Sequence, residues 1–443
     1  MRSHALLALP VVIPALYLMR YATPFLFLCL TLVSEVFSGY WKNMGIPIPL
    51  DRVFLLICLA LLARDHRAQL LRRVIRWRPI HMLLALLVAV AVSSAFWAGT
   101  WRSRVGVYSL LDRLGIVPFL LFALAPVLVP DERRRTQLLM VLAGLGAYLG
   151  LTTLFEAVKL NALVWPHYIN DPSIGIHFGR GRGPFAEAVA NGLALFATGT
   201  AAGIVGWQRQ RRPEGVVCLA ICGLCTVSLF FTLTRAVWLA GCVGILVAAI
   251  AARPVRTVVV RAAPLLAVAI VVALLVIPGL RTATHQRTSD QRSIWDRLNT
   301  NNAATAIVAA HPLTGVGWEG FVTAAPSYMR QAASYPLTGD DLEVHNVLLS
   351  HAAELGLPAT ALWLVCLGGS VGLALVTRAE GDLQLWRLGL LVLAIDWAVT
   401  GSFTPLAYAF PNLLLWLWTG IVLTPYLSRS VKPSARWLGA RAS

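Results

Sequence analysis

Long apolar runs alternate with short arginine-rich segments along the whole chain. The runs lie at about 5–19, 22–39, 52–63, 80–97, 114–129, 137–158, 185–205, 216–233, 236–252, 257–278, 346–376, 385–404 and 406–426. Several approach the roughly 20 residues that a helix needs to cross a bilayer. The first run has no small-residue cleavage site, so we expect it to be retained. The pattern predicts an all-α polytopic membrane protein of about twelve spans, forming one transmembrane unit over residues 1–443.

The arginine-rich segments predict how the helices are oriented. They lie at 64–79, 131–135, 207–213, 253–261, 377–387 and 428–437. Counting runs between them places all of these segments on one side of the membrane, and basic loops mark the cytoplasmic side. The segments 160–184 and 280–345 then form the exoplasmic loops, of which the second is much the longer.

Composition agrees with a membrane protein and bears on which partners we expect. The chain is 58% hydrophobic and 13% charged, whereas a soluble domain is about 25% charged. The net charge of +17 could suggest nucleic acid, but basic cytoplasmic loops account for it, so no nucleic-acid partner is expected. The cysteines at 218, 222 and 225 have no histidine or carboxylate within their run, so no metal site is predicted.

The loop at 280–345 is too long to be a simple connection, and long loops in compact proteins usually carry function. Residues 290–311 have helical spacing behind an N-terminal aspartate, and HPLTGVGWEGF (311–321) has the glycine and proline content of turns. Residues 324–333 could form a second short helix. We therefore expect a small helical cap over the exoplasmic face.

His345 stands where the long loop enters the next apolar run. Asp340 or Asp341 could cap the helix that follows. The histidine could simply end the helix at the membrane surface, or it could act as a general base at a water-accessible site. His351 and Glu354 fall on other faces of that helix, so we do not expect them to share the site.

Arginines on the exoplasmic side are the other candidates. Arg235 could be a snorkelling residue at a tight turn, Arg180 and Arg182 a basic loop with neighbouring glycines, and Arg292 a solvated helix position. If they converge with His345, they suit a multiply anionic ligand at the membrane surface, such as a lipid pyrophosphate. The carboxylates Asp396 and Glu187 are interpreted as structural. Their positions are within or at the edge of apolar runs.

The stretch HNVLLSHAAELGLPA (345–359) resembles the signature of the bacterial O-antigen ligase and polymerase superfamily. His345, Asn346 and Gly356 match it, while Ala359 replaces a usual glycine. HPLTGVGWEGF (311–321), QRSIW (291–295) and TRAVWLAG (234–241) are similar to further motifs of that family, in matching order. The resemblance covers about residues 180–425.

This resemblance implies a GT-C-like membrane glycosyltransferase of the Gram-negative inner membrane, with no metal or other cofactor. Such a ligase takes O-antigen glycan from undecaprenyl pyrophosphate and transfers it to a sugar hydroxyl of lipid A–core, on the periplasmic side. By motif match His345 would be the base, and Arg235 and Arg292 would bind pyrophosphate. Arg180 and Arg182 are added from their position alone.

Three other functions remain open. An O-antigen polymerase would use the same donor, but the arginines at 182, 281, 287 and 292 lack the glycine eleven positions later that such enzymes are expected to carry. A protein O-oligosaccharyltransferase would differ only in its acceptor. A secondary transporter is disfavoured because the chain shows no internal repeat and its candidate charges lie at one face, whereas transporter sites lie near the midplane.

Overall fold

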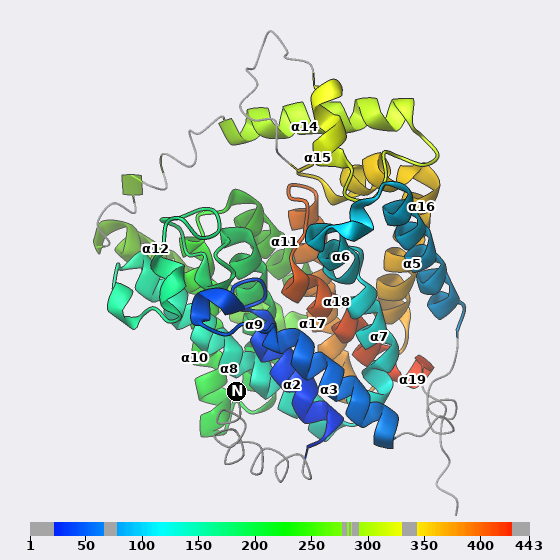
Figure 1. Ribbon diagram of the computed structural model, residues 1–443. Coiled ribbons are helices and arrows are strands. Elements are labelled where there is room, and N and C mark those ends of the chain that lie inside the picture. Colours follow the sequence, from blue (N-terminus) through cyan, green and yellow to red (C-terminus); the bar gives the residue numbers. More distant parts are fainter. Residues whose placement is uncertain are drawn as a thin grey trace, which may run out of the picture.

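The computed structural model describes residues 22–65, 78–276, 281–282, 285, 292–329 and 343–427. Within these ranges the chain is helical and contains no β-strand. Figure 1 shows a bundle of helices with a smaller helical layer across one end. The predicted run at 5–19 and the residues Asp340 and Asp341 fall outside the described ranges.

Each described apolar run coincides with a helical segment of the bundle. These are α2 (Pro24–Glu35), α3 (Leu50–Asp65), α5 (Pro79–Trp97), α6 (Arg104–Ser109) with η3 (Leu110–Leu114) and α7 (Ile116–Leu128), α8 (Glu132–Ala157), α9 (Ala188–Gln208), α10 (Pro213–Phe231), α11 (Arg235–Ala251), α12 (Arg253–Val276), α16 (Val347–Val376), α17 (Leu383–Gly401) and α18 (Ala409–Val422), followed by α19 (Thr424–Leu427). Among the described residues, eight segments are long and apolar enough to cross a membrane, while α2, α11 and α18 are shorter. The protein is thus multi-pass, and the predicted number of about twelve spans stays a prediction.

Side-chain size decides which helix lies at the centre of the bundle. The sequence of α9 is rich in alanine and glycine, and 89% of its apolar window is buried, against none for α12. Small residues let helix backbones approach closely. A Cβ at Gly199 would lie only 2.9 Å from the Cβ of Cys225 on α10. The position of α9 among α8, α10, α17 and α18 follows from this close approach.

Two contacts bring three of the predicted basic segments together with neighbouring parts of the bundle. Arg135 forms a bidentate ion pair with Asp382 at 2.6 and 2.9 Å, which joins the segments 131–135 and 377–387. Arg78 donates to the carbonyl of Tyr426 at 3.3 and 3.4 Å and stacks over its ring, which joins the segment 64–79 to the end of the bundle. These contacts agree with the predicted topology, in which the segments 64–79, 131–135 and 377–387 lie on the same side of the membrane.

The predicted cap is present at the opposite end. The helix expected over 290–311 is confirmed as α14 (Arg292–Ala310), which lies across the bundle near the start of α16 (Figure 1). A short helix α15 (Phe321–Ala324) and a 3₁₀ turn η7 (Ala325–Ser327) pack against it. Of the second helix expected over 324–333, the described part, which ends at residue 329, contains only this 3₁₀ turn after Ala324.

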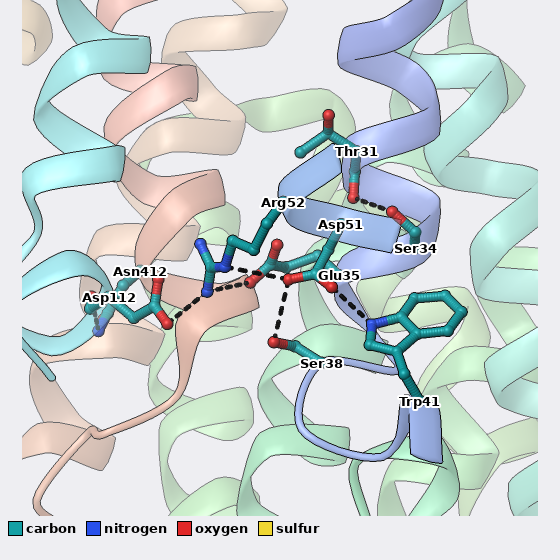
Figure 2. Close-up of polar contacts among 9 residues, drawn as sticks. All are labelled: Thr31, Ser34, Glu35, Ser38, Trp41, Asp51, Arg52, Asp112 and Asn412. Atoms are coloured by element: carbon teal, nitrogen blue, oxygen red, sulfur yellow. Dashed lines mark hydrogen bonds and ion pairs between the residues drawn. The ribbon is translucent and has the colours of Figure 1, made fainter. Parts of the chain in front are cut away.

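A buried cluster of charges joins the N-terminal helices to η3 (Figure 2). Arg52 of α3 lies 2.5 Å from Asp112 of η3, 3.1 Å from Asp51 and 3.5 Å from Glu35 at the end of α2. The indole of Trp41 donates to Asp51 at 2.5 Å. Three carboxylates therefore surround one guanidinium inside the bundle. Removing Arg52 would leave three carboxyl groups inside the bundle without their cation, which is strongly destabilising.

Candidate functional site

His345 lies directly before the helix start that the sequence predicted. The residue that caps α16 is Asn346, with extended backbone at φ −153° and ψ 114°, and its side-chain oxygen accepts from the amide of Leu349 at 3.0 Å. The acidic cap proposed at Asp340 or Asp341 lies outside the described residues, and Asn346 performs this role. The cap fixes where the helix begins, and with it the position of the histidine.

The surroundings of His345 favour its neutral form. Burial and the charge of Arg297 lower the pKa of His345 below its ordinary value of 6.5, against the opposite effect of a backbone hydrogen bond at Glu343. Its Nδ1 is buried and has no hydrogen-bond partner among the described residues. A neutral imidazole with a lone pair available is the form that can accept a proton.

Arg297 of α14 is the residue that sequence reasoning missed. Burial lowers its pKa, and so does the charge of Arg235, which begins α11. Arg297 is thus electrostatically coupled to both Arg235 and His345. The two guanidiniums repel each other electrostatically, so an anion near both would be stabilised by each.

Helical spacing explains why Arg297 lies on the inward side of α14. Arg297 shares one face of α14 with Thr300, Ala304 and Ile307, all fully buried, because positions three, seven and ten residues apart align on a helix. Arg292 occupies the first position of α14, about 140° of helical rotation away from Arg297. Applying this period to 292–310 could have identified Arg297. The pyrophosphate role of Arg292 stays a prediction.

The tight turn predicted before Arg235 is confirmed. Only residues 232–234 separate α10 from α11. Leu233 has φ +48°, a left-handed backbone that allows so tight a reversal. Arg235 is partly buried at the helix start and lies near enough to Arg297 of the cap to lower its pKa.

A second group of side chains reaches this region from the loop before α9. His177 donates from Nδ1 to Glu187 at 2.9 Å, and the other oxygen of Glu187 accepts from the amide of Ala190, so this carboxylate caps α9. The same carboxylate contacts Tyr408 at the start of α18, and His177 lies near enough to lower the pKa of His345. Glu187, interpreted from sequence as structural, is a cap that also orients two polar side chains.

Arg182 is placed differently from its prediction. Its guanidinium donates to the carbonyls of Ile169 at 2.6 and 3.2 Å, of Asp171 at 2.6 Å and of Ile174 at 2.5 Å, and the residue is 1% exposed. These carbonyls belong to the loop that precedes it, so Arg182 holds the loop 160–184 together. The geometry does not support a pyrophosphate ligand here, while Arg180 remains partly exposed on the same loop.

A backbone break in α16 explains how the cap attaches beside His345. Gly356 has φ +79° and ψ +169°, outside helical values, and Pro358 follows it without an amide hydrogen. The carbonyls of Ala353 and Glu354 therefore lose their helical donors. Buried carbonyls without donors are costly, so this break requires partners from another segment.

The motif at 311–321 supplies those partners. The hydrogen bonds run from Val316 N–H to Ala353 O (2.9 Å), from Gly317 N–H to Glu354 O (2.9 Å) and from Leu357 N–H to Pro312 O (2.8 Å). The two sequence motifs thus complete each other's backbone hydrogen bonding. Ala359, the off-pattern position, is buried in the core just beyond the break.

Replacing Gly356 by alanine is expected to unfold this junction. A Cβ there would lie 2.3 Å from the carbonyl oxygen of Leu313, and the positive φ adds strain, of roughly 1–3 kcal/mol for a non-glycine residue. We expect a clear fall in the melting temperature of the purified protein and loss of activity. Gly368→Ala, in the same helix with nothing within 4 Å of its Cβ, is the matched control. Equal melting temperatures for the two variants would contradict this account.

Arg113 of η3 links the cap to α16 with its side chain. It donates to Glu319 of the cap motif at 2.8 Å, bonds to Ser350, and lies 3.1 Å from Glu354. Its guanidinium also stacks 5.0 Å from the ring of Trp318. The adjacent residues of η3 point to different groups: Asp112 contacts Arg52, and Arg113 contacts Glu319 and Glu354. The segment η3 is a π-helical turn, and such turns often occur at functional sites.

The remaining candidates take no part in this arrangement. His351 is fully buried, with ring centroids 5.7 Å from Trp318 and 4.7 Å from Trp363. Asp396 is buried in α17, where its Oδ1 has no hydrogen-bond partner among the described residues. Across the same residues no group of three or more histidine, cysteine or acidic side chains is arranged to hold a metal ion. A metal-independent reaction stays a prediction.

Comparison with known proteins bears on the central part of this site. Residues 219–364 match the family model described as O-Antigen ligase. We found no match to a curated protein. The matched range includes Arg235, Arg297 and His345, together with both motifs that meet at the break in α16. The resemblance inferred from the motifs is thereby confirmed for residues 219–364, which match the O-antigen ligase family.

Proposed function

We propose that the protein transfers a glycan from undecaprenyl pyrophosphate to a sugar hydroxyl of lipid A–core, at the membrane face covered by the cap. The observation that carries the proposal is the placement of a neutral, partly buried His345 beside the coupled pair Arg297 and Arg235. The family match supports a membrane enzyme that acts on lipid-linked glycans. The finer assignment of donor and acceptor follows what the motif resemblance implies.

In this mechanism the acceptor hydroxyl attacks the anomeric carbon of the donor sugar. His345 accepts the hydroxyl proton, the new glycosidic bond forms, and the bond to the pyrophosphate oxygen breaks. The pyrophosphate leaves with the electron pair of that bond, and Arg297 and Arg235 stabilise its growing charge. Attack opposite the leaving group inverts the configuration of the anomeric carbon. Arg292 and Arg180 are further candidates for contact with the pyrophosphate.

The cap face is assigned to the periplasm. The basic loops joined by Arg135–Asp382 and Arg78–Tyr426 lie at the other end of the bundle, and basic loops are retained in the cytoplasm. A lipid-linked donor would then reach Arg235 and Arg297 with its pyrophosphate at the outer surface of the inner membrane of a Gram-negative bacterium.

The pH dependence of transfer should report on His345. Burial and the charge of Arg297 lower the pKa of His345 below 6.5. The base therefore stays neutral at pH 7, and the rate should fall only when the pH drops below the lowered pKa of His345. Arg297→Gln removes a nearby positive charge, so protonated His345 becomes less unfavourable and the acidic limb should move to higher pH. We would measure initial rates from pH 4.5 to 8 for both proteins. If the acidic limb of the pH–rate profile is the same for both proteins, the predicted effect of Arg297 on the pKa of His345 is contradicted.

Reconstitution with a lipid-linked glycan and two acceptors, lipid A–core and a second lipid-linked glycan, tests the proposed function. Transfer to lipid A–core supports a ligase. Elongation of the lipid-linked glycan instead would make the protein a polymerase, and transfer to a protein acceptor alone would make it an O-oligosaccharyltransferase. Solute flux across the vesicle membrane without any glycan product would identify a transporter.

A further inference from the structure

A cleft at the arginine-rich end of the bundle lies far from the site beneath the cap. It has a volume of about 530 Å³, within the roughly 300–1,000 Å³ of small-molecule sites. Its walls are mainly apolar side chains of α2 and α8: Phe25, Leu26, Cys29, Met140 and Val141. Its polar lining consists of Arg134 and Arg209 with the uncharged Thr136 and Gln137. The cleft therefore combines an apolar wall with a doubly charged rim.

Both arginines are held at the cleft by local structure. Arg134 lies in the first turn of α8, where its amide is capped by Asp131 at 2.8 Å, and its guanidinium stacks 4.6 Å from the ring centre of Phe25. Arg209 is the C-cap of α9. Their neighbour Arg135 is paired with Asp382. Within the part of the chain that the structure describes, neither Arg134 nor Arg209 has a carboxylate at ion-pair distance.

We propose that this cleft binds an anionic phospholipid of the inner leaflet, with an acyl chain along the apolar wall and the phosphate between Arg134 and Arg209. Two like charges at one end of an apolar cleft are complementary to a molecule that is anionic at one end and apolar along the rest. Basic pockets between transmembrane helices on the cytoplasmic side bind acidic headgroups by this chemistry. Arginine binds phosphate bidentately and keeps its charge.

The N-terminal segment before α2 is the other conceivable occupant. Residues 1–21 are apolar enough to lie on the wall, but they contain Arg2 and Arg20 and no acidic residue. That segment would add positive charge to a rim that already carries two guanidiniums. An anionic lipid neutralises the rim, and for this reason it is the occupant that the charges favour.

Native mass spectrometry of the full chain in mild detergent tests the proposal, with phosphatidylglycerol and phosphatidylcholine of identical acyl chains as probes. We expect wild type to retain phosphatidylglycerol preferentially, and Arg134→Gln/Arg209→Gln to lose roughly tenfold or more of that retention. Arg133→Gln/Arg211→Gln makes the same charge change at exposed positions outside the cleft and should retain the lipid like wild type. Equal retention of both lipids by wild type, or equal loss in both double variants, would overturn the proposal.

A cleft-filling variant tests the acyl-chain part without changing charge. Met140 lines the cleft and is 37% exposed, so Met140→Trp should narrow the cleft and weaken retention of phosphatidylglycerol even if the arginine variants fail to fold. Inorganic phosphate is the probe for a simple anion site. Phosphate protecting the wild type from thermal unfolding as well as phosphatidylglycerol does would show that no lipid site exists.

Discussion

His345→Ala is expected to abolish glycan transfer while leaving the protein folded. The side chain of His345 lies outside α16, immediately before the N-cap residue Asn346. Its removal therefore leaves the capping hydrogen bond of Asn346 intact. A positioned base contributes roughly 10²–10⁴-fold to the rate. We therefore expect transfer to fall by about that factor, measured as initial rate with purified protein, lipid-linked glycan and lipid A–core.

The control for this variant is another histidine outside the site. His167 is exposed on the loop before α9, and His167→Ala should transfer at the wild-type rate. Melting temperatures of both variants should match the wild type, which separates a lost base from a lost fold. Near-normal transfer by folded His345→Ala would remove this residue from the mechanism.

Arg297→Ala is expected to reduce transfer by roughly 10²–10³-fold, the usual effect of removing one preorganised charge donor. Arg235→Ala should have an effect of similar order, because in the proposed mechanism both guanidiniums stabilise the charge that grows on the pyrophosphate. The structure couples Arg297 to both Arg235 and His345. Arg292→Ala, about 140° of helical rotation away on the same helix, is the matched variant, and we expect it to retain more activity.

Arg297→Lys separates charge from geometry. It keeps a positive charge but loses the planar fork that binds phosphate bidentately, so its transfer rate should lie between those of wild type and Arg297→Ala. The reverse order, with Arg292→Ala inactive and Arg297→Ala active, would return the pyrophosphate role to the residue that motif similarity indicated.

Much of the fold could be predicted because membrane helices must satisfy their own backbone hydrogen bonds. Each described apolar run therefore appears as a helix, and α14 lies where helical spacing placed it. The number of crossings could not be predicted as well. Apolar length alone does not distinguish a short helix inside the bundle, such as α2 or α18, from one that spans the bilayer.

The site was predicted less completely than the fold. His345 and Arg235 stand out in sequence because each charged or titratable side chain begins an apolar segment. Arg182 stood out for the same reason, yet its donors are taken by carbonyls from its own loop. No sequence pattern reveals which carbonyls a loop will turn toward a guanidinium.

The sequence by itself determined the helical membrane class, the position of the cap, the grouping of the basic loops and the family. These properties depend on hydropathy, charge and local motifs, which act over a few helical turns. Only the tertiary structure decided that Arg297 lies near enough to His345 to lower its pKa, that the guanidinium of Arg182 binds carbonyls of its own loop, and that the break at Gly356 receives the cap motif. Those outcomes depend on which buried donors and acceptors meet across long sequence separations, because a buried polar group takes whichever partner the packing brings to it.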